Sequence, residues 1–298
     1  MDKTPIRGVH HTTGPSAVRR RSLRLRPALA IAALIAVAPL ALVRPAAAVT
    51  NSQPDGDGHP YAGMFVGDFS PSHTGLEPGC SGTLVSPTVF LTAAHCIVNR
   101  PERQAAQLYV TFDPAWPFPG APTDLHAVAS YHADPDFLTR DFPAWHDLAV
   151  FVLAAPVAGI TPARLPTAGL LDQLAAKGGL IGATFDVVGY GIQGFEVGGG
   201  PPQPIGDPLA TGLVERRVAT SRFQALTPDV LNLFMQDVLG YGGTCLGDSG
   251  GPHLLGGTNL LVGTSSWIDA GGCQAYSANV RLDTPQARAF LGQYVTLP

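Results

Sequence analysis

Cys-Leu-Gly-Asp-Ser-Gly-Gly-Pro, residues 245–252, is the stretch of sequence that decides the fold. Three glycines flank Ser249, so the backbone can turn sharply there and bring its amides close to a reacting carbonyl group. A bare Gly-x-Ser-x-Gly is most often an ordinary glycine-rich turn, but here eight consecutive residues fit the pattern around a nucleophilic serine. This stretch therefore predicts an enzyme with Ser249 as its nucleophile.

Two further stretches supply the groups that such a serine needs. Residues 91–96 (LTAAHC) place His95 after an apolar run, and histidine suits general-base catalysis because its unperturbed pKa lies near neutrality. Residues 146–153 (HDLAVFVL) place Asp147 just before an apolar strand, where an acid can orient an imidazole. Either stretch alone is weak, because a lone histidine is more often structural and an acid at a strand edge is more often just solvated.

The three stretches together resemble the chymotrypsin/trypsin family of serine peptidases, in a secreted, bacterial-type form. Their chain order of histidine, aspartate and serine is that family's order, and the resemblance covers roughly residues 59–295. It implies that His95 acts as general base and then acid, that Asp147 holds its tautomer and orientation, and that Ser249 is the nucleophile. The amides of Gly247 and Ser249 would form the oxyanion hole.

The four cysteines of the chain are expected to form disulfides. An even count in an exported protein suggests two bonds, and four cysteines allow three pairings that spacing alone does not decide. The resemblance implies the pair Cys80–Cys96, which brackets the histidine. It also implies the pair Cys245–Cys273, which ties the nucleophile loop to a wall of the substrate pocket.

The same resemblance assigns the residues that would bind the substrate. Gly243 and Thr244 would lie at the base of the pocket, where Gly243 replaces an aspartate. Ser266, Trp267 and Ile268 would form the edge on which a bound peptide adds as a strand. Without a carboxylate at Gly243, a lysine or arginine side chain would lack a buried counter-charge. Because Ile268 also replaces the usual glycine, we predict a preference for small or medium apolar side chains before the cut.

Activation in this family depends on a new N-terminal amine that pairs with the aspartate before the nucleophile, here Asp248. The usual sequence Ile-Val-Gly-Gly is absent, but the proline-aromatic pair at residues 60–61 places the corresponding position at Ala48 or Val49. Cleavage after Ala48 would expose Val49, a β-branched residue like the family's isoleucine. We therefore expect Val49 to be the partner of Asp248. The equally weighted alternative is that residues 49–58 form a leader and that Asp248 is hydrogen-bonded in another way.

Residues 1–48 predict a signal peptide. A basic block, an apolar run over residues 27–43 and Ala46-Ala47-Ala48 follow one another, in the order typical of secretion. The run is short and interrupted by proline, which disfavours a membrane anchor, and Arg20-Arg21 is a weak signal for twin-arginine export. The segment holds eight of the 18 basic and one of the 22 acidic residues, which leaves ten and 21, a net charge of about −11. Such acidity excludes nucleic acid as a partner.

The mature part, residues 49–298, is therefore expected to be a secreted monomer that acts on peptides or proteins. A protein inhibitor is a further partner that the resemblance implies. We expect no membrane contact once the signal peptide is removed, and no cofactor. Calcium occurs in the family, but no cluster of residues in this chain argues for a metal.

The composition of the mature part is typical of an all-β protein. The chain has 35 glycines and 28 prolines, which suit short strands joined by turns. We expect two packed six-stranded antiparallel β-barrels of the chymotrypsin-like kind, from about residue 59 to 160 and from about 175 to 283. Strands are predicted at Ala62–Val66, Gly82–Val85, Val89–Thr92, Leu108–Phe112, Leu148–Leu153, Phe185–Gly189, Thr211–Val218, Asn259–Ser265 and Ala275–Val280.

Three segments between or after these strands have their own signals. Thr284 as a cap and Pro285 at the first helical position predict a C-terminal helix over about residues 285–295. A second, short helix is predicted over Pro228–Phe234. The many glycines and prolines of residues 193–208 predict a mobile loop outside the core.

Three other interpretations fit parts of the sequence. An α/β-hydrolase shares Gly-x-Ser-x-Gly but orders its groups serine, aspartate, histidine, and the one histidine after Ser249 is His253, with no acid between them. An inactive homologue that only binds would usually lack one of the three catalytic groups, and all three are present. A metal enzyme could use His126, His132, Asp134 and Asp136 as ligands. No helix-spaced pair of ligands supports such a site, so these residues are better interpreted as surface polar residues.

Overall fold

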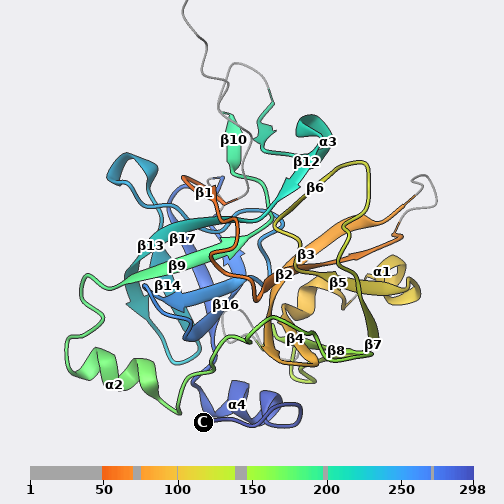
Figure 1. The fold of residues 1–298 in the computed structure, drawn as a ribbon. Helices are drawn as coiled ribbons and strands as arrows, with labels where there is room; N and C mark the ends of the chain where they lie inside the picture. The colour runs from red at the N-terminus through yellow and green to blue at the C-terminus, as the bar shows by residue number, and fades with distance from the viewer. Residues whose placement is uncertain (1–48, 70–74, 99, 138–145, 197–200, 270–271) are drawn as a thin grey trace, which may run out of the picture. The chain divides into compact units, whose positions relative to one another are not determined.

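The computed structural model describes residues 49–69, 75–98, 100–137, 146–196, 201–269 and 272–298. The predicted signal peptide lies outside these residues. Strands form most of the regular structure, as the all-β prediction requires (Figure 1). No helix among the described residues has the length and apolar character needed to span a bilayer.

The first barrel is closed by six antiparallel strands in the order β2-β3-β4-β8-β7-β5. These strands are β2 (Ala62–Gly67), β3 (Glu77–Ser86), β4 (Val89–Thr92), β5 (Leu108–Thr111), β7 (His126–Ala133) and β8 (Ala149–Leu153). Its centre is aromatic: the ring of Phe151 lies 5.1 Å from that of Phe65 and 6.4 Å from that of Phe90, between centroids. Gly82 makes room for these rings, because a Cβ there would lie 2.4 Å from the Phe90 ring.

The second barrel has the strand order β13-β14-β17-β16-β15-β9 and closes because β13 also pairs with β9. These strands are β9 (Thr184–Gly189), β13 (Arg217–Leu226), β14 (Val230–Phe234), β15 (Pro252–Leu255), β16 (Leu261–Ile268) and β17 (Tyr276–Arg281). The short strand β1 (Gln53–Pro54) adds to β13. Phe185, Val187 and Leu231 are fully buried inside. The prediction of two six-stranded barrels is confirmed.

Short elements fill the connections between these strands. They are η1 (Ala94–Cys96), α1 (Pro101–Ala105), β6 (Ala115–Pro117), α2 (Leu170–Ala176), β10 (Gly194–Glu196), β11 (Gln203–Ile205), α3 (Pro208–Thr211), β12 (Leu213–Glu215), η2 (Asp237–Leu239) and α4 (Pro285–Leu291). Strand β10 pairs with β11, and β12 pairs with β6, in the upper part of Figure 1. Neither pair belongs to a barrel.

Two local predictions need correction. Residues 230–234 form strand β14 rather than a helix, because Leu231 and Leu233 point into the second barrel and the segment pairs with both β13 and β17. A short apolar run fits either period, and its neighbours decide between them. The predicted loop at residues 193–208 contains the hairpin of β10 and β11, and Phe195 of β10 packs against the buried cluster of Met235, Cys245 and Cys273.

The predicted C-terminal helix is present as α4. Its cap is Thr284, whose Oγ1 accepts a hydrogen bond from the amide of Ala287 at 3.2 Å. Phe290 belongs to the buried cluster that fills the first barrel. Tyr294 then stacks on His132 of β7, with ring centroids 5.2 Å apart. The end of the chain therefore returns from the second barrel to the first.

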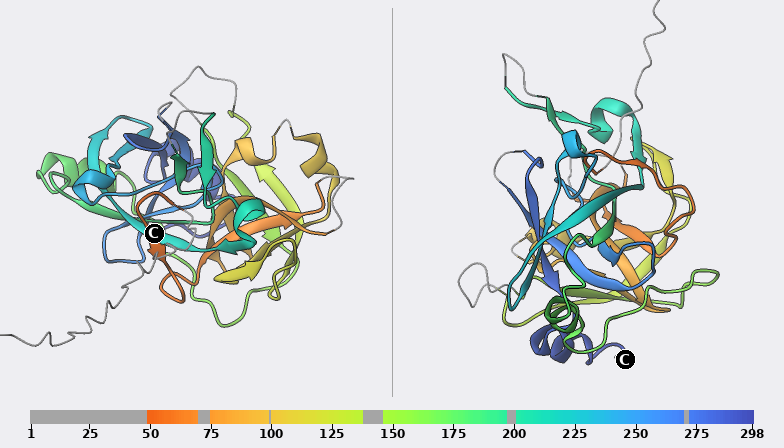
Figure 2. Two further views of the ribbon diagram at one scale, coloured as in Figure 1. Left: turned by 90° about the horizontal axis from the view of Figure 1, so that it is seen from above. Right: turned by 90° about the vertical axis from the view of Figure 1, so that its left-hand side faces the viewer.

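The two barrels meet at Ser81 of β3. Its amide and Oγ donate hydrogen bonds to the carbonyl oxygen of Gly247, at 3.2 and 3.0 Å, and its Oγ accepts one from the amide of Tyr190 at 3.0 Å. Figure 2 shows the orange to yellow-green strands of the first barrel beside the teal to blue strands of the second. Because Gly247 belongs to the stretch 245–252, this contact fixes the serine loop against the first barrel.

Candidate active site

His95 and Asp147 come together because the strands that carry them are paired. His95 lies in η1, directly after β4, and Asp147 lies two residues before β8, with Thr92 opposite Ala149 in the ladder. Asp147 is 1% exposed. Its Oδ2 lies 2.7 Å from His95 Nδ1, and its Oδ1 accepts a hydrogen bond from the His95 amide at 2.8 Å. One carboxylate therefore holds both the ring and the backbone of the histidine.

A third donor reaches the same carboxylate from the second barrel. The hydroxyl of Ser266, in β16, donates a hydrogen bond to Asp147 Oδ2. Asp147 is therefore fixed from both sides of the site, and Ser266 lies at the edge that the sequence predicts for substrate binding. His95 remains about one-third exposed, so its imidazole is accessible from the cleft.

The serine loop keeps two backbone amides unused. The amide of Asp248 donates to Cys245 O at 3.1 Å and that of Gly250 donates to Ser265 O at 2.8 Å. The amides of Gly247 and Ser249 donate to no backbone oxygen among the described residues. Glycine is required at 247, since φ is +94° and a Cβ would lie 2.8 Å from Gly191 Cα. This loop presents the donors that an oxyanion hole needs.

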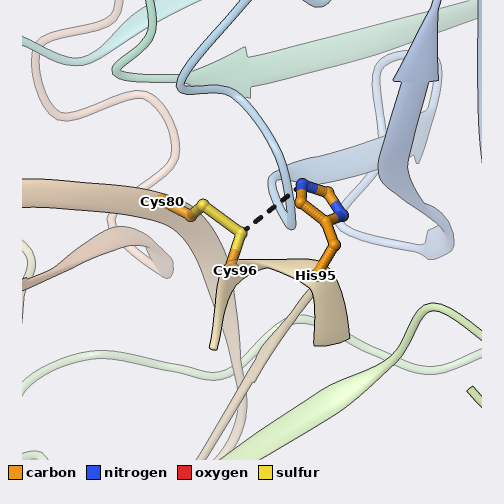
Figure 3. A group of neighbouring side chains, drawn as sticks. All are labelled: Cys80, His95 and Cys96. Atoms are coloured by element: carbon orange, nitrogen blue, oxygen red, sulfur yellow. Dashed lines mark hydrogen bonds between the residues drawn. A yellow bond between two sulfur atoms is a disulfide. The ribbon is translucent and has the colours of Figure 1, made fainter. Parts of the chain in front are cut away.

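The serine hydroxyl and the histidine are not hydrogen-bonded to each other in the described part of the chain. Within the described ranges no hydrogen bond joins Ser249 Oγ to His95, although Ser249 is only half-buried. His95 Nε2 lies 3.8 Å from Cys96 Sγ instead (Figure 3). Catalytic hydrogen bonds are often long in the absence of substrate and tighten when it binds. The structure thus joins two of the three predicted groups directly and brings the third through the Ser81 contact.

Both predicted disulfides are confirmed. Cys80 of β3 is bonded to Cys96 beside the histidine, as Figure 3 shows, and Cys245 is bonded to Cys273. Cys80, His95 and Cys96 lie close enough together to resemble a metal site. Their sulfur atoms are committed to each other, and metal ligation needs the free thiolate.

Removal of the first disulfide is expected to cost stability. Replacing Cys80 and Cys96 together by serine should lower the free energy of unfolding by about 3 kcal/mol in the chain-entropy model, since the bond spans 16 residues. The bond between Cys245 and Cys273 spans 28 residues and provides a matched control. Its loss should cost about 0.5 kcal/mol more, because closure entropy grows slowly with length. Urea unfolding of the two double variants measures both values, and no loss in either would contradict the expectation.

Several of the residues predicted to line the substrate pocket are held by contacts near the Cys245–Cys273 disulfide. Thr244 is buried, and its Oγ1 lies 3.3 Å from Ser265 Oγ. Ile268 packs against a buried cluster of Met235 and the Cys245–Cys273 bond. The ring of Trp267 lies 5.8 Å from that of Tyr276, between centroids.

Sequence reasoning missed two buried residues near the pocket. His253 of β15 is completely buried, with Nε2 3.3 Å from Thr244 Oγ1 and Nδ1 3.4 Å from Ser265 Oγ. Burial lowers the pKa of His253 to about 3, so the imidazole is neutral at physiological pH. Met235 is the second, and nothing in its local sequence marks it. His253 could have been found as a histidine inside an apolar strand four residues after the serine.

Asp248 is buried without a cationic side chain beside it. Its Oδ1 accepts a hydrogen bond from the Gly191 amide and its Oδ2 one from the Cys245 amide, both at 2.8 Å. Burial raises the pKa of the Asp248 carboxyl to about 7. The two hydrogen bonds from the amides lower this pKa but do not offset the effect of burial. No ion pair within the described residues includes this carboxylate.

Val49 is completely buried in the second barrel, in the cluster that also holds Ala219 and Leu231. The next residue, Thr50, pairs with Gly243: their backbone amides and carbonyls exchange hydrogen bonds of 2.8 and 3.2 Å. Val49 has φ of 64°, a left-handed conformation that is rare for a β-branched residue. The segment at 49–50 is therefore part of the second barrel rather than a loose leader.

The residues weighed for a metal enzyme do not form one group. Asp134 and Asp136 lie near His146, and Asp134 Oδ2 is 3.1 Å from His146 Nδ1. His132 stacks on the C-terminal segment instead. Asp134, Asp136 and His146 form a cluster whose ligand atoms lie within 4.8 Å of one another, and Asp134 Oδ1 also accepts a hydrogen bond from the Asp136 amide at 2.9 Å.

Comparisons with known proteins agree with this geometry. A family model described as Trypsin matches residues 57–284. A trypsin from Phaedon cochleariae is 33% identical over 205 residues, which cover 64% of this chain and 69% of that protein. Trypsin Blo t 3 from Blomia tropicalis is 28% identical over 195 residues, which cover 63% and 66%. Seminase from Drosophila melanogaster is 25% identical over 177 residues, 58% of either chain.

A solved structure shares the fold. The chain of HL collagenase superimposes with a TM-score of 0.58 at 18% identity, and the match covers 83% of this chain and all of that one. At this identity the likeness concerns the arrangement of the two barrels alone.

Proposed function

This chain belongs to the trypsin family of serine-type endopeptidases, and we propose that it cuts peptide bonds with His95, Asp147 and Ser249. The observation that carries the proposal is the double hydrogen bond from His95 to one buried carboxylate. With Nδ1–H directed at Asp147, Nε2 is the nitrogen that can take a proton. Ser249 lies on a loop in which its own amide and that of Gly247 donate to no backbone oxygen among the described residues, which supports its role as nucleophile.

The chemistry is acyl transfer in two halves. Ser249 Oγ attacks the substrate carbonyl carbon while its proton passes to His95 Nε2, and the carbonyl electrons move to the oxygen, which the amides of Gly247 and Ser249 receive. The carbon–nitrogen bond then breaks, and the leaving amine takes the proton from His95. Water attacks the acyl-enzyme in the same way, and the acid product leaves with Ser249 restored.

The substrate would bind as an added strand. Ser266 and Trp267 lie at the end of β16, on the same side of the site as Asp147, which supports backbone hydrogen bonds from a peptide there. Thr244 and Ile268 would then line the space for the side chain that precedes the cut. We propose peptides or proteins as substrates, a monomer as the active form and a protein inhibitor as a further partner, with no cofactor.

Covalent labelling tests the proposed function directly. A serine-reactive organophosphonate should add one label per chain, at Ser249, and Ser249→Ala should take up none. The competing class is an inactive homologue that only binds, and it would take up no label even with Ser249 present. A label on another residue, or none at all, would contradict the proposal.

We also propose that the protein is secreted after cleavage at residue 48. The basic block, the apolar run and Ala46-Ala47-Ala48 support export, and Arg20-Arg21 is a weak signal for the twin-arginine route. The two disulfides support an oxidising destination, because such bonds are rare in the reducing cytosol.

The same cleavage would generate the active N-terminus. Val49 is buried in the second barrel and Thr50 pairs with Gly243, so a free amine on Val49 would begin inside the protein. Asp248 lies five residues after Gly243, the partner of Thr50, and it is buried and carries no cationic partner among the described residues. The strain at Val49 exists only while a peptide bond precedes it, so cleavage would remove that strain as well.

A single added residue tests this activation. Protein that starts at Val49 should be active, and protein with one alanine added before Val49 should lose at least tenfold in kcat/KM. The added residue removes the charge from the buried position, and a buried carboxylate without its partner costs several kcal/mol. Active-site titration gives the competent fraction of each protein. Equal kcat/KM in the two proteins would refute the role of the amine.

The pH dependence of stability gives an independent readout. The pKa of Asp248 is about 7 in the folded chain and 3.8 when unfolded, so the folded state retains a proton that the unfolded state releases. Stability is therefore full below about pH 4 and falls as pH rises through 7. Protein with the added alanine should show this fall between about pH 4 and 7 in thermal unfolding, with little further change above pH 7. In protein that starts at Val49, the free amine should offset this loss of stability. The same dependence of melting temperature on pH in both proteins would contradict the pairing of Val49 with Asp248.

A further inference from the structure

We propose that Met235 forms the floor of the pocket that receives the substrate side chain before the cut, and that it limits this pocket to short side chains. The inference rests on the proposed function, since it takes Gly243 as the base of that pocket. Met235 lies directly after β14, ten residues before Cys245.

The backbone of Gly243 is held in place from one side. Its carbonyl oxygen accepts hydrogen bonds from the amide and Oγ1 of Thr50, at 2.8 and 3.1 Å. Its amide donates to the carbonyl oxygen and Oγ1 of Thr50, at 3.2 and 2.9 Å. Four hydrogen bonds to one residue leave the base of the pocket little freedom to retreat when a large side chain enters.

The space on the other side of Gly243 is already filled. A Cβ at Gly243 would lie 2.8 Å from Met235 Sδ, 3.1 Å from Met235 Cβ and 2.8 Å from Ser221 Oγ. Distances below 3.0 Å are closer than carbon atoms approach in proteins, so no side chain fits there without movement. Met235 therefore occupies the place that an aspartate at 243 would use. The base of the proposed pocket lacks a carboxylate because Met235 already fills the space that a side chain at position 243 would need.

Met235 is itself well supported. It is 1% exposed and packs with the Cys245–Cys273 disulfide and with Ile268. Its amide donates a hydrogen bond to Ala275 O at 3.0 Å, which ties it to the strand that follows Cys273. Methionine fills irregular space well, and here it is held by a covalent cross-link on one wall.

Met235 also lines a cavity of about 620 Å³, together with Thr50, Gln193, Phe195, Asp237 and Cys273. The lining includes none of Gly243, Thr244 and Ile268. Because Met235 both fills the space beside Gly243 and lines this cavity, truncating it would deepen the proposed pocket toward the cavity.

The first test varies the depth of the pocket. Peptides that differ only in the residue before the cut (alanine, valine, leucine, phenylalanine or lysine) give kcat/KM for each side chain. The natural protein should favour alanine and valine. In Met235→Ala the ratio for phenylalanine over alanine should rise by about 10- to 100-fold, since each methylene that gains a place in an apolar pocket contributes on that scale.

Two variants control for general effects of the substitution. Met235→Leu keeps the volume and should keep the natural ratio. Met64→Ala removes the same side chain from the first barrel, where Met64 is equally buried, and should lower stability without changing the ratio. Active-site titration with the organophosphonate corrects every rate for the folded fraction.

The second test uses Gly243. Gly243→Asp alone should lose activity on all five peptides and gain none on lysine, because Met235 fills the place of the new side chain. Gly243→Asp with Met235→Ala should cleave after lysine at least tenfold faster than either single variant. If Met235→Ala does not fold, Met235→Val and Gly243→Asp alone still provide both comparisons.

The outcomes separate this inference from the proposed function. A natural protein that takes no label and cuts no peptide would refute the function. An active protein in which Met235→Ala leaves the phenylalanine-to-alanine ratio unchanged would refute the role of Met235. Efficient cleavage after lysine by Gly243→Asp alone would refute it as well, because it would show that the space is not filled.

Discussion

Ser249→Ala is expected to lower kcat by about 10⁶-fold, and His95→Ala by a similar factor, with the fold intact in both. The two groups act in one proton transfer, so removing either removes the step. The double variant should therefore lose little more than either single variant. Residual turnover should remain above the uncatalysed rate, since the oxyanion-hole amides and substrate binding survive.

The measurement is steady-state hydrolysis of one peptide substrate, with unfolding curves to show that each variant is folded. His132→Ala is the matched control, because His132 is an exposed histidine of the first barrel that lies outside the site. Its kcat should stay within a factor of two or so of the natural value. Substantial activity in Ser249→Ala would end the proposal of a serine nucleophile.

Arg281→Met is expected to cause the largest loss of stability, about 3 to 5 kcal/mol in the free energy of unfolding. Arg281 is buried, and its guanidinium donates to Asp283 at 3.0 Å from both Nε and Nη2. It also donates to Asp172 of α2, at 3.1 and 2.7 Å, and to Thr227 O at 2.8 Å. Removing the arginine leaves the carboxylate of Asp283, which is 0% exposed, without its counter-charge.

Chemical unfolding at neutral pH measures this loss. Arg222→Met is the control, because Arg222 is exposed and its guanidinium lies over the Tyr241 ring at 6.0 Å, a weak interaction at the surface. It should change stability by less than about 1 kcal/mol. The combined variant Arg281→Met with Asp283→Leu should recover part of the loss, since the buried carboxylate is gone and the Asp172 carboxylate, which also loses Arg281, is exposed to solvent. A stability of Arg281→Met equal to that of the natural protein would show that the charges are not buried in solution.

The parts of the fold that could be predicted from sequence are those in which local pattern and structure coincide. Val89–Thr92 is predicted and observed with the same bounds, because a run of four apolar or β-branched residues leads straight into His95. The disulfides followed from the resemblance rather than from spacing. The prediction of a helix at residues 230–234 was wrong because this segment forms a strand by pairing with β13 and β17, which lie elsewhere in the sequence.

The base of the pocket could be predicted only in part for the same reason. Gly243 and Ile268 sit at fixed distances from the cysteines, so the sequence locates them. Met235 and His253 contact Gly243 and Thr244, the residues predicted to form the base of the pocket, through side-chain packing across the barrel, and such contacts leave no local signal. Contacts between segments that are distant in the chain are the hardest feature to predict from a single sequence.

Each disulfide closes within one barrel: Cys80–Cys96 in the first and Cys245–Cys273 in the second. Two stretches of backbone connect the barrels: the linking chain between Leu153 and Thr184, and the segment between β1, which pairs with β13, and β2. The proposed catalytic groups come from both barrels, so we expect hydrolysis only when the barrels are docked. A chain whose halves are folded but parted would hold every proposed group and no working site, so we expect it not to digest itself or its neighbours before assembly is complete.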